Sequence, residues 1–338
     1  MALWTDVIDP ATLTGYIREA LSDIESRKGS LARYLPNRET PDISVRFVAG
    51  QAGLVAEASY RAYDAEPEVG KKPSGQRIVL ELPAVGQNIP VSEYDQLRTR
   101  NASDELVLRE ILNTASQVAQ AVSDRVERVR ATVLRTGVAT ISEIAAADDY
   151  GRTAGHTVTA GTLWSSATSV SRLTDLQTWV DTYETTNGTL PGRIVMSRNA
   201  FRLLQTGDEF KTSLVGGGSR RATADQVNEI VEGEGLPPIE VYTRRTSAGL
   251  LLPADELLLL PEPVDPNDWQ GTQLGSTFWG QTLTSSEADW DLADVDQPGV
   301  VAGVYRNEKP PMIAEVVSDA IALPVAANAN LSFKAKVA

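Results

Sequence analysis

Few residues of this 338-residue chain carry the side chains that catalysis usually needs. The sequence holds one histidine, His156, and no cysteine. A Ser–His–Asp triad or a histidine metal site would therefore depend on His156, and thiolate chemistry is excluded. His156 lies in the polar stretch DDYGRTAGHTVTAG, which is typical of a loop. We interpret it as a surface loop histidine and expect no catalytic residue.

Carboxylates are the more abundant candidates, because residues 246–305 contain acids but no Lys or Arg. The stretch DWDLADVD (289–296) departs from a calcium-binding loop, since Ala293 and a missing glycine break the ligand pattern. No carboxylate spacing is diagnostic of glycoside hydrolysis. The segment therefore predicts a solvated acidic surface, with no metal and no cofactor. Its acids are Asp255, Glu256, Glu262, Asp265, Asp268, Glu287, Asp289, Asp291, Asp294 and Asp296.

The formal net charge is −14, which makes tight binding of duplex DNA over a broad surface unfavourable. The start, MALWTDVIDPATL, lacks a basic region followed by an apolar run, so we expect no secretory signal. No run approaches the ~18 apolar residues of a membrane helix, so we expect no membrane partner.

A glycine-rich stretch, VGGGSRR (215–221), lacks the spacing of a phosphate-binding loop. It is more typical of a flexible loop that could line a symmetric opening in an oligomer. The candidate residues for such a loop are Gly216, Gly217, Gly218, Arg220 and Arg221.

Several long elements must position these residues. Residues 101–137 form one uninterrupted helical pattern, roughly 50 Å long at 1.5 Å per residue, with one apolar face and Gly137 at its end. Residues 9–28 predict a shorter helix. Residues 43–91 predict a long polar hairpin whose tip carries Lys71 and Lys72. Helices and strands then alternate as in a small α/β domain, and strands and turns dominate from residue 250 onward.

The order of these parts resembles the Hong Kong 97-type capsid fold of tailed phages, an α+β fold. Local phrases are similar to major capsid proteins of phages of actinobacteria: ARYLPNRE (32–39), YDAEPEVG (63–70), IPVSEYDQL (89–97) and ALPVAANANL (322–331). The resemblance covers essentially the whole chain. It implies an N-terminal arm with a helix (1–44), an E-loop hairpin (45–90), a peripheral domain with a spine helix (91–140), an axial domain (141–300) and returning strands (301–338).

The resemblance implies a structural protein that assembles as hexamers and pentamers into an icosahedral virion capsid around double-stranded DNA, in the host bacterial cytoplasm. Its partners would be other copies of the chain, a portal protein at one vertex, and a separate scaffolding or decoration protein. The packaged DNA would be faced without tight binding. Candidate contacts between subunits are Arg61, Tyr63, Lys71, Lys72 and Arg77.

Three alternatives remain at the level of sequence. A shell protein of a bacterial nanocompartment, similar to encapsulin, would share the fold. Some phages of this fold cross-link a hairpin lysine to a neighbour's asparagine, for which Asn328 and Asn330 would be the candidates. An acid-dependent hydrolase is the third alternative.

Overall fold

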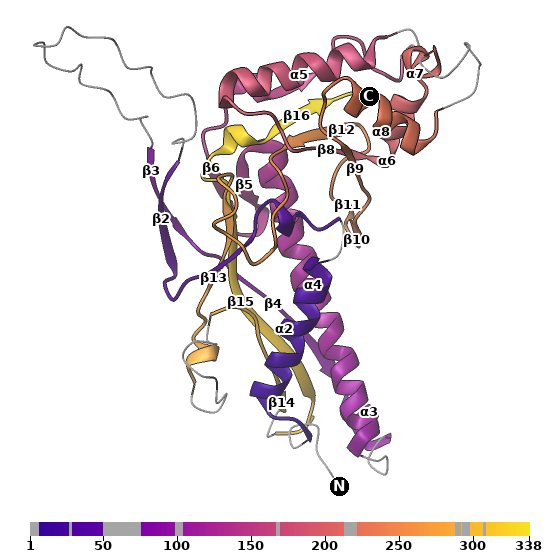
Figure 1. Cartoon of the computed structure of the whole chain (residues 1–338). Coiled ribbons are helices and arrows are strands. Elements are labelled where there is room, and N and C mark those ends of the chain that lie inside the picture. Colours follow the sequence, from indigo (N-terminus) through magenta and orange to yellow (C-terminus); the bar gives the residue numbers. More distant parts are fainter. Residues whose placement is uncertain are drawn as a thin grey trace, which may run out of the picture.

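The computed structural model describes residues 7–26, 29–49, 76–98, 104–166, 170–212, 222–287, 292, 298–306 and 309–338. Its longest element is helix α4 (Asp104–Thr136), which runs from the lower end of the molecule into its upper part (Figure 1). We call the lower part the leg and the upper part the head.

Helix α4 forms where the sequence predicted it, because its apolar residues recur on one face and its 33 residues contain no Gly or Pro. Gly137 ends the helix with a φ of 72°, a left-handed conformation that favours glycine. The apolar face serves both parts of the molecule: Val107 to Val126 pack in the leg, and Val129 to Leu134 pack in the head.

The leg is built on α4, on helix α2 (Pro10–Ser26) and on a five-stranded sheet. Asp9 accepts a hydrogen bond from the Thr12 amide (2.8 Å) at the start of α2. The leg sheet has the order β1 (Asn37–Glu39), β13 (Ser276–Gly280), β15 (Ala314–Val325) and β14 (Val301–Arg306), and β4 (Ala84–Val91) also pairs with β15. Alternate residues of β15 are buried against α4, so the strand and the spine helix share one core. Helix α3 (Glu93–Arg98) lies at the lower end (Figure 1).

The head is built on a second five-stranded sheet with the order β7 (Thr157–Thr159), β16 (Phe333–Lys336), β12 (Glu256–Leu260), β8 (Arg193–Ser197) and β9 (Ile239–Tyr242). Strand β12 is buried along its whole length, as its run of four leucines requires. Four helices accompany this sheet: α5 (Arg172–Asn187), α6 (Arg198–Gln205), α7 (Asp208–Thr212) and α8 (Ala224–Gly233). The head therefore has the expected α/β character.

Three two-stranded ribbons and five short 3-10 helices complete the described structure. The ribbons are β2 (Ser44–Ala49) with β3 (Gln76–Glu81), β5 (Val138–Ile141) with β6 (Ala146–Asp149), and β10 (Arg245–Thr246) with β11 (Gly249–Leu250). The 3-10 helices are Leu31–Arg33, Ser142–Ile144, Ala154–His156, Thr284–Ser286 and Ala329–Leu331.

The segment expected to form one hairpin divides between two sheets. Strand β2 pairs with β3 in an antiparallel ribbon, whereas β4 pairs with β15 in the leg sheet. The ribbon is also less dependent on other subunits than its polar composition suggested. Val45, Leu80 and Leu82 are buried in the subunit's own core, and Phe47 meets the Tyr150 ring edge-on with centroids 6.1 Å apart. The base of the hairpin therefore belongs to the core of its own subunit.

Candidate functional site

The junction of head and leg holds a buried charged cluster centred on Arg130 of α4, whose side chain is fully buried. Its guanidinium donates to Glu25 (2.6 Å) and Glu127 (3.4 Å), to the Asn37 side-chain oxygen (2.7 Å) and to the Thr277 hydroxyl (2.8 Å). These partners come from α2, α4, β1 and β13. The Arg130 side chain is thus hydrogen-bonded to residues of four elements of the leg.

Glu127 extends the cluster toward the head. One of its carboxylate oxygens accepts hydrogen bonds from the Leu31 amide (2.7 Å) and the Tyr242 hydroxyl (3.0 Å), and Arg244 lies 3.5 Å away. Burial lowers the pKa of Arg130, but Glu25 and Glu127 outweigh this effect and raise the pKa above its ordinary value. Arg130 therefore keeps its positive charge, and the cluster has a structural role.

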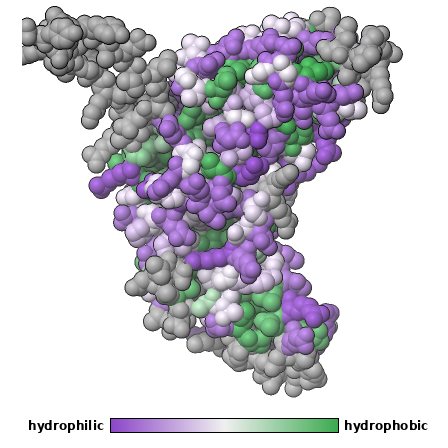
Figure 2. Space-filling view, viewed as in Figure 1, coloured by the Kyte–Doolittle hydropathy of each residue, from purple (hydrophilic) through white to green (hydrophobic). Residues whose placement is uncertain are grey.

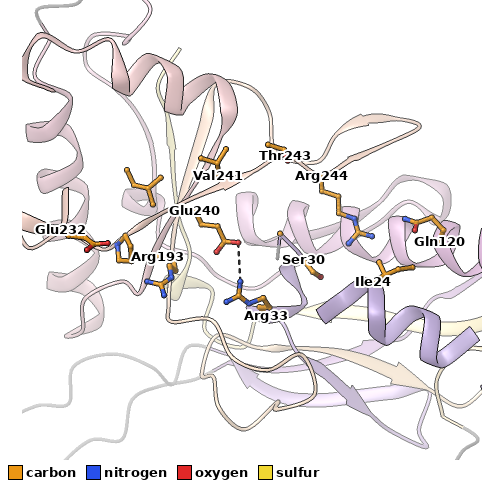
Figure 3. Close-up of a pocket in the computed structure, with 13 residues that line it drawn as sticks. Ile24, Ser30, Arg33, Gln120, Arg193, Glu232, Glu240, Val241, Thr243 and Arg244 are labelled. Carbon is orange, nitrogen blue, oxygen red and sulfur yellow. Dashed lines mark ion pairs between the residues drawn. The ribbon is translucent and has the colours of Figure 1, made fainter. Parts of the chain in front are cut away.

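A cleft of about 860 Å³ lies beside this cluster, between β9 and the junction of α2 with α4 (Figure 3). Its three arginines are paired with acids: Arg33 with Glu240 (3.7 Å), Arg193 with Glu262 (3.1 Å) and Arg244 with Asp124 (3.0 Å). Among the described residues that line it there is neither a histidine nor a lysine, and Ser30 caps the short helix 31–33 by accepting from the Ala32 amide. The cleft therefore holds no activated nucleophile.

His156 is buried, and the expectation of a surface loop histidine is wrong. It ends the 3-10 helix Ala154–His156, and its ring lies 5.4 Å from that of Phe333 and 6.1 Å from that of Tyr183. Neither ring nitrogen has a hydrogen-bond partner in the described part of the chain. Burial lowers the pKa of His156, and the nearby Arg152 acts in the same direction, while backbone groups of Ser332 and Asn330 oppose it. The ring has neither the partner nor the exposure of a catalytic base.

The acidic segment does not gather a metal site within the residues that the structure describes. Glu256 pairs with Arg135 (2.5 Å) and Lys334 (3.5 Å). Asp265 and Asp268 accept hydrogen bonds from backbone amides two and three residues further along, as turn residues do. The stretch 289–296 lies outside the described residues except for Leu292.

Most of the residues expected at subunit contacts also lie outside the described ranges. These are Arg61, Tyr63, Lys71, Lys72, Gly216, Gly217, Gly218, Arg220 and Arg221. Arg77 lies in β3, opposite Val48. The two candidate cross-linking asparagines make contacts within their own chain. The side-chain amide of Asn328 donates to the Gln273 carbonyl (2.6 Å), and the side-chain oxygen of Asn330 accepts from the Thr153 amide (2.8 Å).

The leg carries large apolar side chains at its surface, among them Leu97 (51% exposed), Leu106 (51%) and Met312 (36%). Figure 2 shows apolar residues gathered low on the leg and mostly hydrophilic residues over the head. In the described part of the chain, no helix is long and apolar enough to cross a membrane. Exposed apolar surface of this kind is typical of contacts with other protein surfaces.

The arrangement of head, leg and spine helix is shared with solved capsid-related structures. The structure of the putative capsid protein of a prophage of E. coli CFT073 is similar over 98% of this chain and 99% of that chain, with 15% identity and a TM-score of 0.65. A phage-related protein from Bordetella bronchiseptica RB50 is similar over 97% of this chain and 96% of that one, with 12% identity and a TM-score of 0.56. No curated protein matches the sequence. The fold class is the α+β capsid fold of the Hong Kong 97 type.

The sequence profile of the family described as phage major capsid protein E matches residues 10–273. The chain belongs to this family, and it is a structural component of the virion capsid that forms the icosahedral shell. The family is not enzymatic, in agreement with the interpretation of His156 and the acids as non-catalytic residues.

Proposed function

We propose that this chain assembles as hexamers and pentamers into the shell around the double-stranded DNA of a tailed phage of actinobacteria. In this proposal the head is the axial domain, near the capsomer axis, and the leg is the peripheral domain. The observation that carries it is the 33-residue helix α4, which contributes to the cores of both parts and braces an elongated subunit. The phrases shared with capsid proteins of actinobacterial phages support the choice of host.

The segment between β2 and β3 is proposed to clamp a neighbouring subunit. Its base is held in the subunit's own core by Val45 and Leu80, so the segment 50–75 starts from a fixed point. Arg61, Tyr63, Lys71 and Lys72 within this segment, with Arg77 in β3, are the proposed contact residues. Positive charges there would meet the acidic surface of the next copy, whose net charge is −14.

The loop containing Gly216, Gly217, Gly218, Arg220 and Arg221 is proposed to project toward the capsomer axis. It joins α7 to α8, which lie in the head, away from the leg (Figure 1). The proposed further partners are a portal protein at one vertex and separate scaffolding or decoration proteins. The net negative charge supports a shell that does not bind the enclosed DNA tightly, which suits a genome that must leave the capsid. Assembly would take place in the host cytoplasm.

The test is electron microscopy and sedimentation of the purified protein beside a variant in which a short Gly/Ser linker replaces residues 50–75. The linker leaves Val45, Leu80 and Leu82 in place, so the variant should keep the thermal stability of the wild type. We expect closed shells with five- and six-fold capsomers from the wild type and only small species from the variant.

Two results would contradict the proposal. Wild-type material that remains monomeric under all assembly conditions would remove the shell function, and shells built from pentamers alone and filled with protein cargo would indicate a nanocompartment. Normal shells from the linker variant would remove only the clamping role of the hairpin.

A further inference from the structure

Three arginines of the head surround a hollow and lack acidic partners. Arg198 and Arg202 lie one turn apart on α6, Arg245 begins β10, and all three are exposed. They line a cavity of about 380 Å³ together with Thr243, Leu252 and other residues, none of them acidic. Within the described ranges none of the three arginines forms an ion pair. We call this set the arginine patch.

The acids nearest to the patch in sequence are engaged elsewhere. Asp255 follows Ala254, which lines the cavity, but it pairs with Lys336 (3.2 Å), and Glu256 pairs with Arg135 (2.5 Å). In a chain with 45 acids and 31 bases, three neighbouring arginines without a counter-charge are unusual. Like charges in proximity repel one another, so the patch favours a partner that supplies negative charge.

Helix α8 carries a matching surface of opposite sign. Asp225, Glu229 and Glu232 follow one another at intervals of four and three residues, so they share one face of the helix, and all three are exposed. The opposite face buries Val227 and Val231 in the head core. No Lys or Arg occurs between residues 222 and 243, and in the described structure none of the three acids forms an ion pair. We call this set the acidic stripe.

Within the described residues the two surfaces form no ion pair with each other, and Arg198 and Glu232 approach opposite ends of one strand pair. Strands β8 and β9 are parallel, and Ser197 lies opposite Tyr242 where both strands end. Arg198 directly follows that end, whereas Glu232 lines the cleft at the start of the pair, with Arg193 and Ile239. At about 3.3 Å per residue the two ends are roughly 13 Å apart, well beyond the reach of an ion pair.

We propose that the arginine patch of one copy receives the acidic stripe of the next copy, which gives a head-to-tail contact between heads around the capsomer axis. Such a contact is heterologous: each copy uses its patch toward one neighbour and its stripe toward the other, and the repeated rotation closes a ring. The contact uses charges that form no ion pair among the described residues of the single chain. It would therefore determine which face of one subunit meets the next, without a covalent link. The inference rests on the proposed capsomer and names the surfaces that form it.

The test is a charge-reversal cycle followed by sedimentation velocity. One variant carries Arg198→Glu and Arg202→Glu, a second carries Glu229→Arg and Glu232→Arg, and a third combines all four changes. We expect each double variant to lose assembled material by about tenfold at about 50 mM salt, with a smaller difference at about 500 mM salt because of screening. The combined variant should recover most of the wild-type assembly, because the signs are exchanged on both sides.

The matched control is Asp181→Arg with Glu184→Arg, which reverses two exposed acids on α5, outside both surfaces. It should assemble as the wild type does, and a loss equal to that of the second variant would overturn the proposal. Thermal unfolding checks that every variant folds. If a reversal prevents folding, Arg198→Gln with Arg202→Gln is measured in its place, and it should lose part of the assembly.

Three further results would overturn the proposal while leaving the shell function intact. The first is wild-type assembly by folded double variants, and the second is failure of the combined variant to recover. The third is a loss of binding to a short duplex DNA by the Arg198→Glu, Arg202→Glu variant with unchanged assembly, which would assign the patch to nucleic acid. Failure of the wild type itself to form capsomers would instead remove the proposed function.

Discussion

Replacing Arg130 with methionine is the most direct test of how the leg and head are held together. The change removes a fully buried positive charge and its contacts with Glu25, Glu127, Asn37 and Thr277. Methionine approximates the length of the side chain, so the loss of packing is small. Glu25, which is 5% exposed, then has no positive partner among the described residues, and the fully buried Glu127 keeps only Arg244, 3.5 Å away.

The expected cost is about 3–5 kcal/mol, which is the range for removing one partner of a buried ion pair. At about 2–4 °C per kcal/mol, the melting temperature of the unassembled subunit should fall by roughly 6–20 °C. The measurement is thermal unfolding by circular dichroism on dissociated subunits. A variant that also carries Glu25→Gln and Glu127→Gln should be more stable than the single variant, because no buried charge is then left unpaired.

The same substitution at Arg109 is the matched control, because this residue lies on the same helix but is 67% exposed and its one ion pair, with Glu105, is 3.6 Å long. It should change the unfolding free energy by less than about 0.5 kcal/mol. The reasoning is refuted if Arg130→Met costs under about 1 kcal/mol, or if the triple variant is no more stable than the single one.

Three other predictions follow from buried positions. Val122→Asp places a charge at a site that is 1% exposed in the leg core. We expect the free energy of unfolding measured in urea to fall by several kcal/mol, and we expect no assembly. A soluble, equally stable and assembling variant would contradict the assignment of this face of α4 to the core. Burial lowers the folded-state pKa of His156 below its ordinary value of 6.5, so the neutral ring contributes stability that is complete above about pH 6.5 and is lost as the pH falls. His156→Gln should therefore reduce the drop in melting temperature between pH 7.5 and 5.5. An unchanged drop would exclude the histidine as its source. Gly275→Ala would bring a Cβ against the Val325 carbonyl oxygen at a φ of 157°, so we expect a destabilisation of about 1–3 kcal/mol by thermal unfolding. A wild-type melting temperature would contradict the close approach.

The sequence predicted the elements with strong periodicity and missed contacts between distant segments. The helix expected over 101–137 is described as Asp104–Thr136, and the expected alternation of helices and strands includes β8 and α6. His156 was assigned to the surface because its neighbours are polar, yet β16 pairs with β7 and brings Phe333 against its ring. That pairing joins residues more than 170 positions apart, so it cannot be predicted from the local composition around His156.

Arg130 was missed for a related reason. The apolar row of α4 includes Val126, Val129 and Val133, and nothing in the sequence around them distinguishes a buried charged residue from an exposed one. Glu127 and Arg130, three residues apart, belong to the buried face where α2 and β1 cover the helix. An ion pair flanked by buried valines is the pattern that could have suggested this, although the partners Glu25 and Asn37 are visible only in the folded chain.

The strands that complete both sheets come late in the chain. Strand β15 pairs with β4, β13 and β14, and β16 pairs with β12 and β7, so neither sheet can close before residues 314–336 have been synthesised. At about 5–20 residues per second, the ribosome needs roughly 20–70 s to reach them. Until then the apolar face of α4 lacks its covering strand, which favours aggregation of the growing chain. A chain truncated before these strands cannot complete either sheet, so we expect it to remain outside the shell.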